Sequence, residues 1–396
     1  MISERIQRMQ QSPIRKLVPF ADEAKKRGIT VFHLNIGQPD IKTPEPVLSA
    51  IKNFSQEIIA YGYSQGEPFL REVIADYFKN YNISVSPDDM IITTGGSEAI
   101  LFAFSVVADI DDEIIVFEPY YTNYNGYAAM SNIKLVPVTT KAENGFALPP
   151  TGEIEEKIND RTKAILICSP NNPTGTVYPK KDLERIVEIA KKHDLFIISD
   201  EVYREFIYGD IEYTSMLHFE DAKERVIVVD SISKRYSACG ARIGYIISKN
   251  REILNGVMKL AQARLCPPIV EQVAAAEAYK MSFSYFKEVQ KEYKKRRDIM
   301  YNELKSIDGV VLELPMGAFY MVVKLPIKDS EHYARWLLEE FNYNNQTVMV
   351  APAGGFYSTP GLGKDEVRMA YVLEESKLRK AMEVIKESLK VYPEKR

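Results

Sequence analysis

Residues 225–244 read RVIVVDSISKRYSACGARIG, and this stretch decides the fold that we expect. Val226 to Val229 are apolar and mostly β-branched, which predicts a short buried strand. Lys234 follows that strand, and Arg242 comes eight residues later. Open α/β sheets bind their ligands at the carboxyl ends of their strands. A desolvated lysine near a second cation suits Schiff-base chemistry there, although an ordinary exposed loop lysine gives the same pattern.

Strands alternate with helices on the N-terminal side of this stretch. The segments MIITTGG, DDEIIVFEPYY, KAILICSPNNPTG and LFIISDEVY each read as an apolar strand that ends in polar, aromatic or glycine residues. This alternation predicts an α/β fold whose mostly parallel sheet has helices on both faces. The residues expected at one edge of that sheet are Gly95, Gly96, Tyr121, Asn172, Asp200 and Lys234.

The Gly95–Gly96 pair precedes a helix that is expected to begin near Ser97 or Glu98. Glycines allow backbone amides to converge, and a helix N-terminus favours negative charge. This junction therefore predicts an anion site, although many such turns bind nothing.

The pattern changes beyond about residue 275. A charged helix over 283–305 is followed by expected strands at VVLEL, FYMVVKL, TVMVAP and VRMAYV, and by a helix over 377–389. We expect a large domain at 45–283 and a smaller α+β domain at 1–44 and 284–396, with the N-terminal arm packed on it.

Composition excludes several classes of protein. The 396 residues carry a net charge of −4, which gives no basic surface for nucleic acid. Three cysteines without CxxC spacing predict neither a disulfide framework nor a zinc site, and the four histidines lie too far apart to suggest a metal site. No signal peptide or membrane-spanning stretch is apparent, so a cytoplasmic protein is expected.

Three motifs occur together in a specific order: SPNNPTG at 169–175, ISDEVY at 198–203 and SISK…ARIG at 231–244. With them the chain resembles class I aminotransferases of the pyridoxal-phosphate fold type I superfamily, close to the aspartate aminotransferase group. The resemblance runs from about Ile14 to the C-terminal helix.

The resemblance implies a role for each matching residue toward pyridoxal 5'-phosphate. Lys234 would form the internal imine and later move protons, and Asp200 would face the pyridine nitrogen. Asn172 and Tyr203 would bond the phenolic oxygen, and Tyr121 would stack on the ring. The residues implied for the phosphate are Gly96, Ser97, Ser231 and Arg242, with Tyr61 contributed by the neighbouring subunit of a homodimer with shared active sites.

The resemblance also implies where substrate binds. Arg368 would grip the substrate α-carboxylate, with Gly37 and Asn172 beside it. Some aspartate-preferring relatives have a lysine at the place of Ser97, which leaves the side-chain end open. Arg264 of the neighbouring subunit is a candidate for that end, and the alternative is a surface or interface residue that pairs with a nearby acid.

The function implied is ping-pong transamination between an L-amino acid and a 2-oxo acid. Aspartate and 2-oxoglutarate are the best guesses, with alanine or aromatic donors as alternatives. A lyase or decarboxylase would use the same Lys234 and Asp200, and a non-catalytic module that only binds the cofactor would not need Arg368. The chain departs from the family pattern at two places. CGAR at 239–242 has Ala241, which would open space beside Arg242, and APAGGFYSTPG at 351–361 would alter the lid over the substrate.

Overall fold

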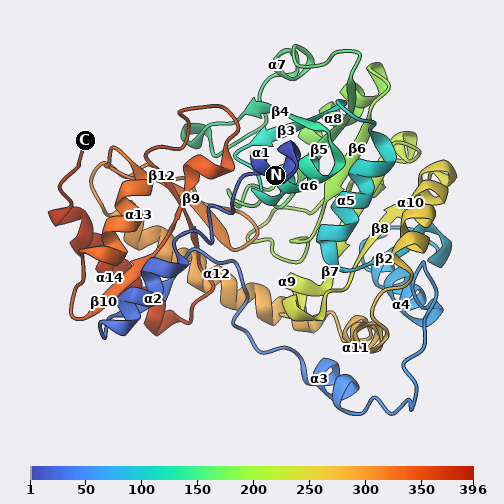
Figure 1. Ribbon diagram of the computed structural model, residues 1–396, viewed down its shortest axis with the longest axis horizontal. Helices are drawn as coiled ribbons and strands as arrows, with labels where there is room; N and C mark the ends of the chain where they lie inside the picture. The colour runs from blue at the N-terminus through green and yellow to red at the C-terminus, as the bar shows by residue number, and fades with distance from the viewer. Residues whose placement is uncertain (1) are drawn as a thin grey trace.

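The computed structural model describes residues 2–396, and a seven-stranded sheet forms the centre of its larger lobe (Figure 1). The strand order is β2-β8-β7-β6-β5-β3-β4. The bounds are Met90–Thr93 for β2, Glu113–Glu118 for β3, Lys134–Thr139 for β4, Thr162–Cys168 for β5, Phe196–Asp200 for β6, Val226–Ser231 for β7 and Gly244–Ser248 for β8. In this sheet β8 runs antiparallel to both neighbours, and the other neighbouring pairs are parallel. The predicted mostly parallel sheet is confirmed.

Helices cover both faces of the sheet, because successive side chains of a strand point to opposite faces. Ile114 and Val116 of β3 lie in one core, together with buried residues of α5 (Gly95–Val107), α6 (Asn123–Ser131) and α10 (Arg251–Arg264). Ile115 and Phe117 lie in the opposite core, with α4 (Pro68–Lys79), α8 (Lys180–Lys192) and α11 (Ile269–Tyr279). The remaining helices of this lobe are α3 (Glu45–Lys52), α7 (Thr151–Glu155) and α9 (Ile232–Arg235).

The smaller lobe contains two short sheets. The strands β9 (Tyr320–Lys324), β11 (Ala351–Pro352) and β12 (Glu366–Ala370) form an antiparallel sheet, and β1 (Thr30–His33) pairs in parallel with β10 (Gln346–Met349). The helices α2 (Val18–Lys26), α13 (Ser330–Glu339) and α14 (Glu375–Val391) pack around them. Leu17 and Leu34 lie in the same core as Val348 and Met369, so the N-terminal arm packs with the C-terminal part of the chain.

The long helix α12 (Ser284–Lys305) contributes to both lobes. Phe286 lies in a core of the larger lobe, and Tyr293 lies in the core of the smaller lobe. Tyr203 and Phe206 also belong to the smaller lobe's core, although they come from the middle of the chain. The division into 45–283 and 1–44 with 284–396 stays a prediction. Among residues 2–396, no helix combines the length and the apolar character needed to cross a membrane.

One local expectation was wrong, and one expected helix begins two residues earlier than predicted. The segment VVLEL at 310–314 forms a single bridge between Val311 and Lys324 instead of a strand, because Val311 remains 38% exposed and has one pairing partner. The helix expected from Ser97 or Glu98 begins at Gly95, whose φ of +76° suits glycine and lets the turn close earlier.

Candidate active site

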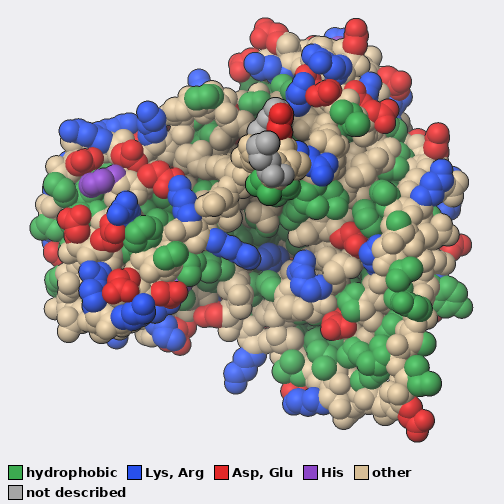
Figure 2. Space-filling model, viewed as in Figure 1, with side chains coloured by type: hydrophobic (Ala, Val, Ile, Leu, Met, Phe, Trp, Pro, Cys, Tyr) green, Lys and Arg blue, Asp and Glu red, His purple; other side chains and the backbone are tan. Residues whose placement is uncertain are grey.

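The carboxyl ends of the parallel strands open into a cavity of about 350 Å³. Lys and Arg side chains gather in the hollow between the two lobes (Figure 2). The cavity lining includes most of the residues that the sequence singled out: Gly37, Gly96, Ser97, Tyr121, Asn172, Asp200, Tyr203, Ser231, Lys234, Arg242 and Arg368. The fold thus brings distant parts of the chain together, since Gly37 and Arg368 are 331 positions apart in the sequence.

Lys234 lies in α9, the single helical turn that follows β7. The Ser231 hydroxyl caps this turn by accepting from the backbone N–H of Ser233 at 3.3 Å. The Lys234 amine donates to the backbone oxygen of Gly37 at 2.9 Å and lies 3.8 Å from the sulfur of Cys239. The Lys234 amine forms no ion pair among residues 2–396. It is therefore available to react with a carbonyl compound in the cavity.

Asp200 ends β6 and is buried. Its Oδ2 accepts from the Tyr124 hydroxyl at 2.6 Å, and its Oδ1 accepts from the backbone N–H of Val202 at 3.2 Å. Burial raises the pKa of Asp200 to about 6, and the two donors oppose that rise. A buried carboxylate of this kind gains by facing a cationic ring nitrogen. Sequence reasoning missed Tyr124, although its position three residues after Tyr121 in an aromatic turn was a usable signal.

The N-terminus of α5 lies close to Arg242. A Cβ atom on Gly95 would collide with the Arg242 guanidinium, and one on Gly244 would lie 2.5 Å from the Gly95 carbonyl carbon. Only glycine at these two positions allows the helix start, β8 and Arg242 to approach so closely. Arg242 donates to the oxygen of Cys239 at 2.8 Å and keeps further N–H groups for a ligand. This arrangement fits a phosphate group.

Arg368 projects from β12 and is 1% exposed. Its Nη1 donates to Oδ1 of Asn172 at 3.1 Å, and its Nη2 donates to the backbone oxygen of Asn35. The guanidinium lies over the ring of Tyr320 at 4.6 Å. Its Nε is buried without a hydrogen-bond partner, and burial lowers the Arg368 pKa. A buried arginine whose protein partners within residues 2–396 are all uncharged is suited to bind a carboxylate from outside.

Two tyrosines complete the lining. The Tyr203 hydroxyl lies 2.9 Å from the Tyr320 hydroxyl, and burial raises the Tyr203 pKa well above its usual value. The Tyr121 hydroxyl accepts from the side-chain amide of Asn123 at 2.9 Å. Burial raises the Tyr121 pKa as well, so both hydroxyls remain protonated at neutral pH and can act as donors in the cavity.

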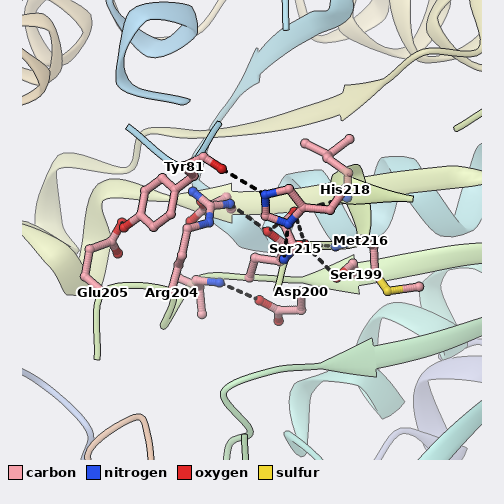
Figure 3. Close-up of polar contacts among 12 residues, drawn as sticks. Tyr81, Ser199, Asp200, Arg204, Glu205, Ser215, Met216 and His218 are labelled. Atoms are coloured by element: carbon pink, nitrogen blue, oxygen red, sulfur yellow. Dashed lines mark hydrogen bonds and ion pairs between the residues drawn. The ribbon is translucent and has the colours of Figure 1, made fainter. Parts of the chain in front are cut away.

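A buried polar network lies next to the ends of β6 and β7, and Figure 3 shows its part around Arg204, Ser215 and His218. Glu201 accepts from Arg204 at 2.8 Å and from the Ser215 hydroxyl at 2.8 Å. Burial raises the pKa of Glu205 to about 7, although the neighbouring arginine opposes this.

The same network continues to the residue that follows Lys234. Asp230 pairs with Arg204 at 3.0 Å and with Arg235 at 2.6 Å, and Arg235 also pairs with Glu205 at 3.0 Å. Glu201, which follows Asp200, and Arg235, which follows Lys234, are therefore both held in buried ion pairs. Sequence reasoning did not find this network, because its members come from separate strands and turns.

Two predicted residues do not line the cavity of their own chain. Tyr61 is 81% exposed on the segment between α3 and α4. Arg264 donates to the backbone oxygens of Ser64 and Ile92, each at 3.2 Å. Both were predicted to act in the neighbouring subunit of a dimer, and both stay predictions.

Comparison with known proteins shows the family. Residues 29–385 match the family model described as aminotransferase class I and II. An aspartate aminotransferase of Pyrococcus horikoshii is 33% identical, over 98% of this chain and 97% of that protein. The crystal structure of an aspartate aminotransferase from Thermotoga maritima superposes with a TM-score of 0.90 at 33% identity, covering 98% of this chain and 100% of the other.

An alanine aminotransferase from Pyrococcus furiosus gives a TM-score of 0.89 at 33% identity, over 98% of this chain and 100% of that one. The relatives thus share one fold while their names differ in amino donor. The predicted resemblance and fold are confirmed. The chain belongs to the class I and II aminotransferase family and is an aminotransferase.

Proposed function

We propose that this protein transfers the amino group of an L-amino acid, with aspartate as the best candidate, to a 2-oxo acid such as 2-oxoglutarate, using pyridoxal 5'-phosphate in a ping-pong cycle. The observation that carries the proposal is the shared cavity of Lys234, Asp200 and Arg368. An amine, a buried carboxylate and a buried arginine that lacks an acidic partner are the groups this chemistry requires.

The cofactor would supply an aldehyde that accepts the amino group and a ring that withdraws electrons from the substrate carbon. The site's anion-binding part, at Gly96, Ser97, Ser231 and Arg242, would hold the phosphate. Asp200 would hold the ring nitrogen in its protonated form.

Other residues of the chain would act on the substrate. Arg368 would orient the α-carboxylate, with Asn172 and Gly37 beside it. The amine of Lys234, once free, would move a proton from the substrate α-carbon to the C4′ carbon of the cofactor. Tyr203, Asn172 and Tyr121 would position the ring between them.

A lyase or decarboxylase would use the same lysine and aspartate, so the products must separate the two possibilities. The names of the relatives favour transamination, since each of the three is an aminotransferase. We further propose a cytoplasmic homodimer in which Tyr61 of one subunit completes the phosphate site of the other.

The test is a screen of all twenty amino acids for conversion of the bound cofactor from its aldehyde to its amine form. We expect conversion, with recovery of the matching 2-oxo acid, and the fastest rate with aspartate or glutamate. Release of carbon dioxide or of an elimination product with no amine form of the cofactor would contradict transamination. A fastest rate with alanine or an aromatic donor would contradict only the choice of aspartate.

A further inference from the structure

We propose that Arg15 binds the side-chain carboxylate of an acidic substrate, so that the cavity selects dicarboxylic amino acids and 2-oxo acids. This inference rests on the proposed function, because it names the substrate class of the same site. Arg15 was not among the residues that the sequence singled out, since nothing in its local pattern marks it.

Of the cations that line the cavity, Arg15 is the one that has no proposed role so far. The lining contains four cations, Arg15, Lys234, Arg242 and Arg368, and two carboxylates, Asp200 and Asp230. Asp230 is already paired with Arg204 and Arg235, and Asp200 accepts from Tyr124 and Val202. Lys234, Arg242 and Arg368 have the proposed amine, phosphate and α-carboxylate roles. Arg15 is the remaining cation, and its guanidinium forms no hydrogen bond or ion pair within the described part of the chain.

The backbone around Arg15 is fixed where it passes between the two lobes. The helix α1 (Glu4–Arg8) contacts α6 of the larger lobe, and α2 contacts α13 of the smaller lobe (Figure 1). The connecting segment 9–17 therefore joins the lobes beside the cavity.

The neighbours of Arg15 within that segment are each anchored. Pro13 is buried against Gly355, and Leu17 is 4% exposed in the smaller lobe's core. The Lys16 amine pairs with Glu331 at 2.6 Å. Arg15 is thus held at its backbone, and it lines the cavity while it remains exposed. A fixed backbone reduces the conformational entropy lost when the guanidinium closes on an anion.

Asn35 connects this segment to the proposed α-carboxylate site. Its side-chain amide donates to the backbone oxygen of Ile14 at 3.1 Å, and its own backbone oxygen accepts from Arg368. Asn35 therefore bonds both to the backbone next to Arg15 and to the Arg368 side chain. Two arginines at related positions can bind the two carboxylates of a single dicarboxylic acid.

Arg264 is the rival for this role. Its guanidinium already donates to two carbonyl oxygens of its own chain and lies 3.8 Å from Glu98. Burial lowers the Arg264 pKa, and Glu98 opposes that shift. Both of these hydrogen bonds come from Nη2, whereas Nε and Nη1 are buried without a hydrogen-bond partner within residues 2–396. Arg264 therefore stays a rival, which the experiment has to separate from Arg15.

The experiment measures binding of succinate and butyrate to cofactor-loaded protein through the absorbance change of the bound cofactor. Both acids have four carbons, and only succinate has a second carboxylate. Arg15→Gln is expected to weaken succinate binding by roughly tenfold or more while butyrate binding stays within about twofold. Lys25→Gln is the control, since it removes an exposed cation that pairs with Asp22 on α2 and does not line the cavity, and it is expected to change neither constant.

The outcomes separate the inference from the proposed function. Equal binding of succinate by wild type and Arg15→Gln would overturn the role of Arg15, as would equal weakening of both acids. Selective loss of succinate binding in Arg264→Ala, with none in Arg15→Gln, would assign the role to Arg264 instead. In all these cases amino-group transfer would still proceed, whereas failure of the proposed function would appear as no transfer from any donor.

Discussion

Among single residues, Tyr124 is the one whose hydroxyl donates to the buried Asp200 carboxylate, at 2.6 Å. Burial raises the Asp200 pKa to about 6, and the Tyr124 donor opposes this rise. Tyr124→Phe removes that donor, so the Asp200 pKa should rise further, by roughly one unit. A carboxylate that faces a protonated ring nitrogen must be ionised, and binding of the cofactor should therefore weaken as pH falls through the Asp200 pKa.

The measurement is the dissociation constant of pyridoxal 5'-phosphate from pH 5 to pH 8, followed by protein fluorescence. We expect the acid limb of the profile to move to higher pH in Tyr124→Phe. Tyr120→Phe is the control, because the Tyr120 hydroxyl donates to Asn125 at 2.7 Å and does not contact Asp200. An unchanged acid limb in Tyr124→Phe would show that the Tyr124 hydrogen bond does not set the charge of Asp200.

Among the elements, β8 meets the start of α5 at the proposed anion site. A Cβ atom on Gly244 would lie 2.5 Å from the carbonyl carbon of Gly95 and 2.6 Å from the backbone nitrogen of Gly96. Gly244→Ala should push the two elements apart and lower the free energy of unfolding by roughly 1–3 kcal/mol. Inorganic phosphate should also bind more weakly to the cofactor-free protein.

Thermal unfolding and phosphate titration together check this prediction, with Gly152→Ala as the control, because a Cβ built there meets no atom of a non-neighbouring residue within 4 Å and Gly152 does not line the cavity. A Gly244→Ala protein with wild-type stability and phosphate affinity would mean that the close approach is not required.

The strand ends could be predicted from sequence, because apolar runs that stop at polar residues mark both a strand and its edge. Lys234, Asp200, Asn172 and Tyr121 all reach the cavity in this way. The prediction of a strand at 310–314 was wrong, because a short apolar run looks the same in the sequence whether or not a partner strand is present. The ion pairs of Asp230 with Arg204 and Arg235 could not be predicted, since they depend on packing between β6, β7 and the turns that follow them.

At the scale of the whole molecule, an exposed apolar segment indicates a missing partner. Ile58, Ile59 and Tyr61 are 78%, 67% and 81% exposed on the extension between α3 and α4 (Figure 1). Large apolar side chains gathered on one exposed segment are typical of a surface that another protein covers. We expect a homodimer, and Tyr61→Phe should weaken cofactor binding by about 1–3 kcal/mol if its hydroxyl bonds a phosphate of the other subunit.

Mixed dimers of Tyr61→Phe and Lys234→Ala chains test this arrangement, compared with each pure variant. If the sites are shared, a mixed dimer pairs both changes in one site and leaves wild-type Tyr61 and Lys234 together in the other. One site of full affinity per mixed dimer is the expected result. A monomeric protein, or a working site whose Tyr61 and Lys234 come from one chain, would refute it.

Identifying the lysine that forms the covalent bond to the cofactor tests the proposed role of Lys234 directly. The protein is loaded with pyridoxal 5'-phosphate, reduced with borohydride, digested and mapped by mass spectrometry. The geometry of the β7–α9 junction predicts that the reduced cofactor is found on Lys234, and that Lys234→Ala carries none there while still binding phosphate. Reduced cofactor on a different lysine of the wild-type protein, or none on any lysine at saturating cofactor, would contradict the proposal that Lys234 forms the imine.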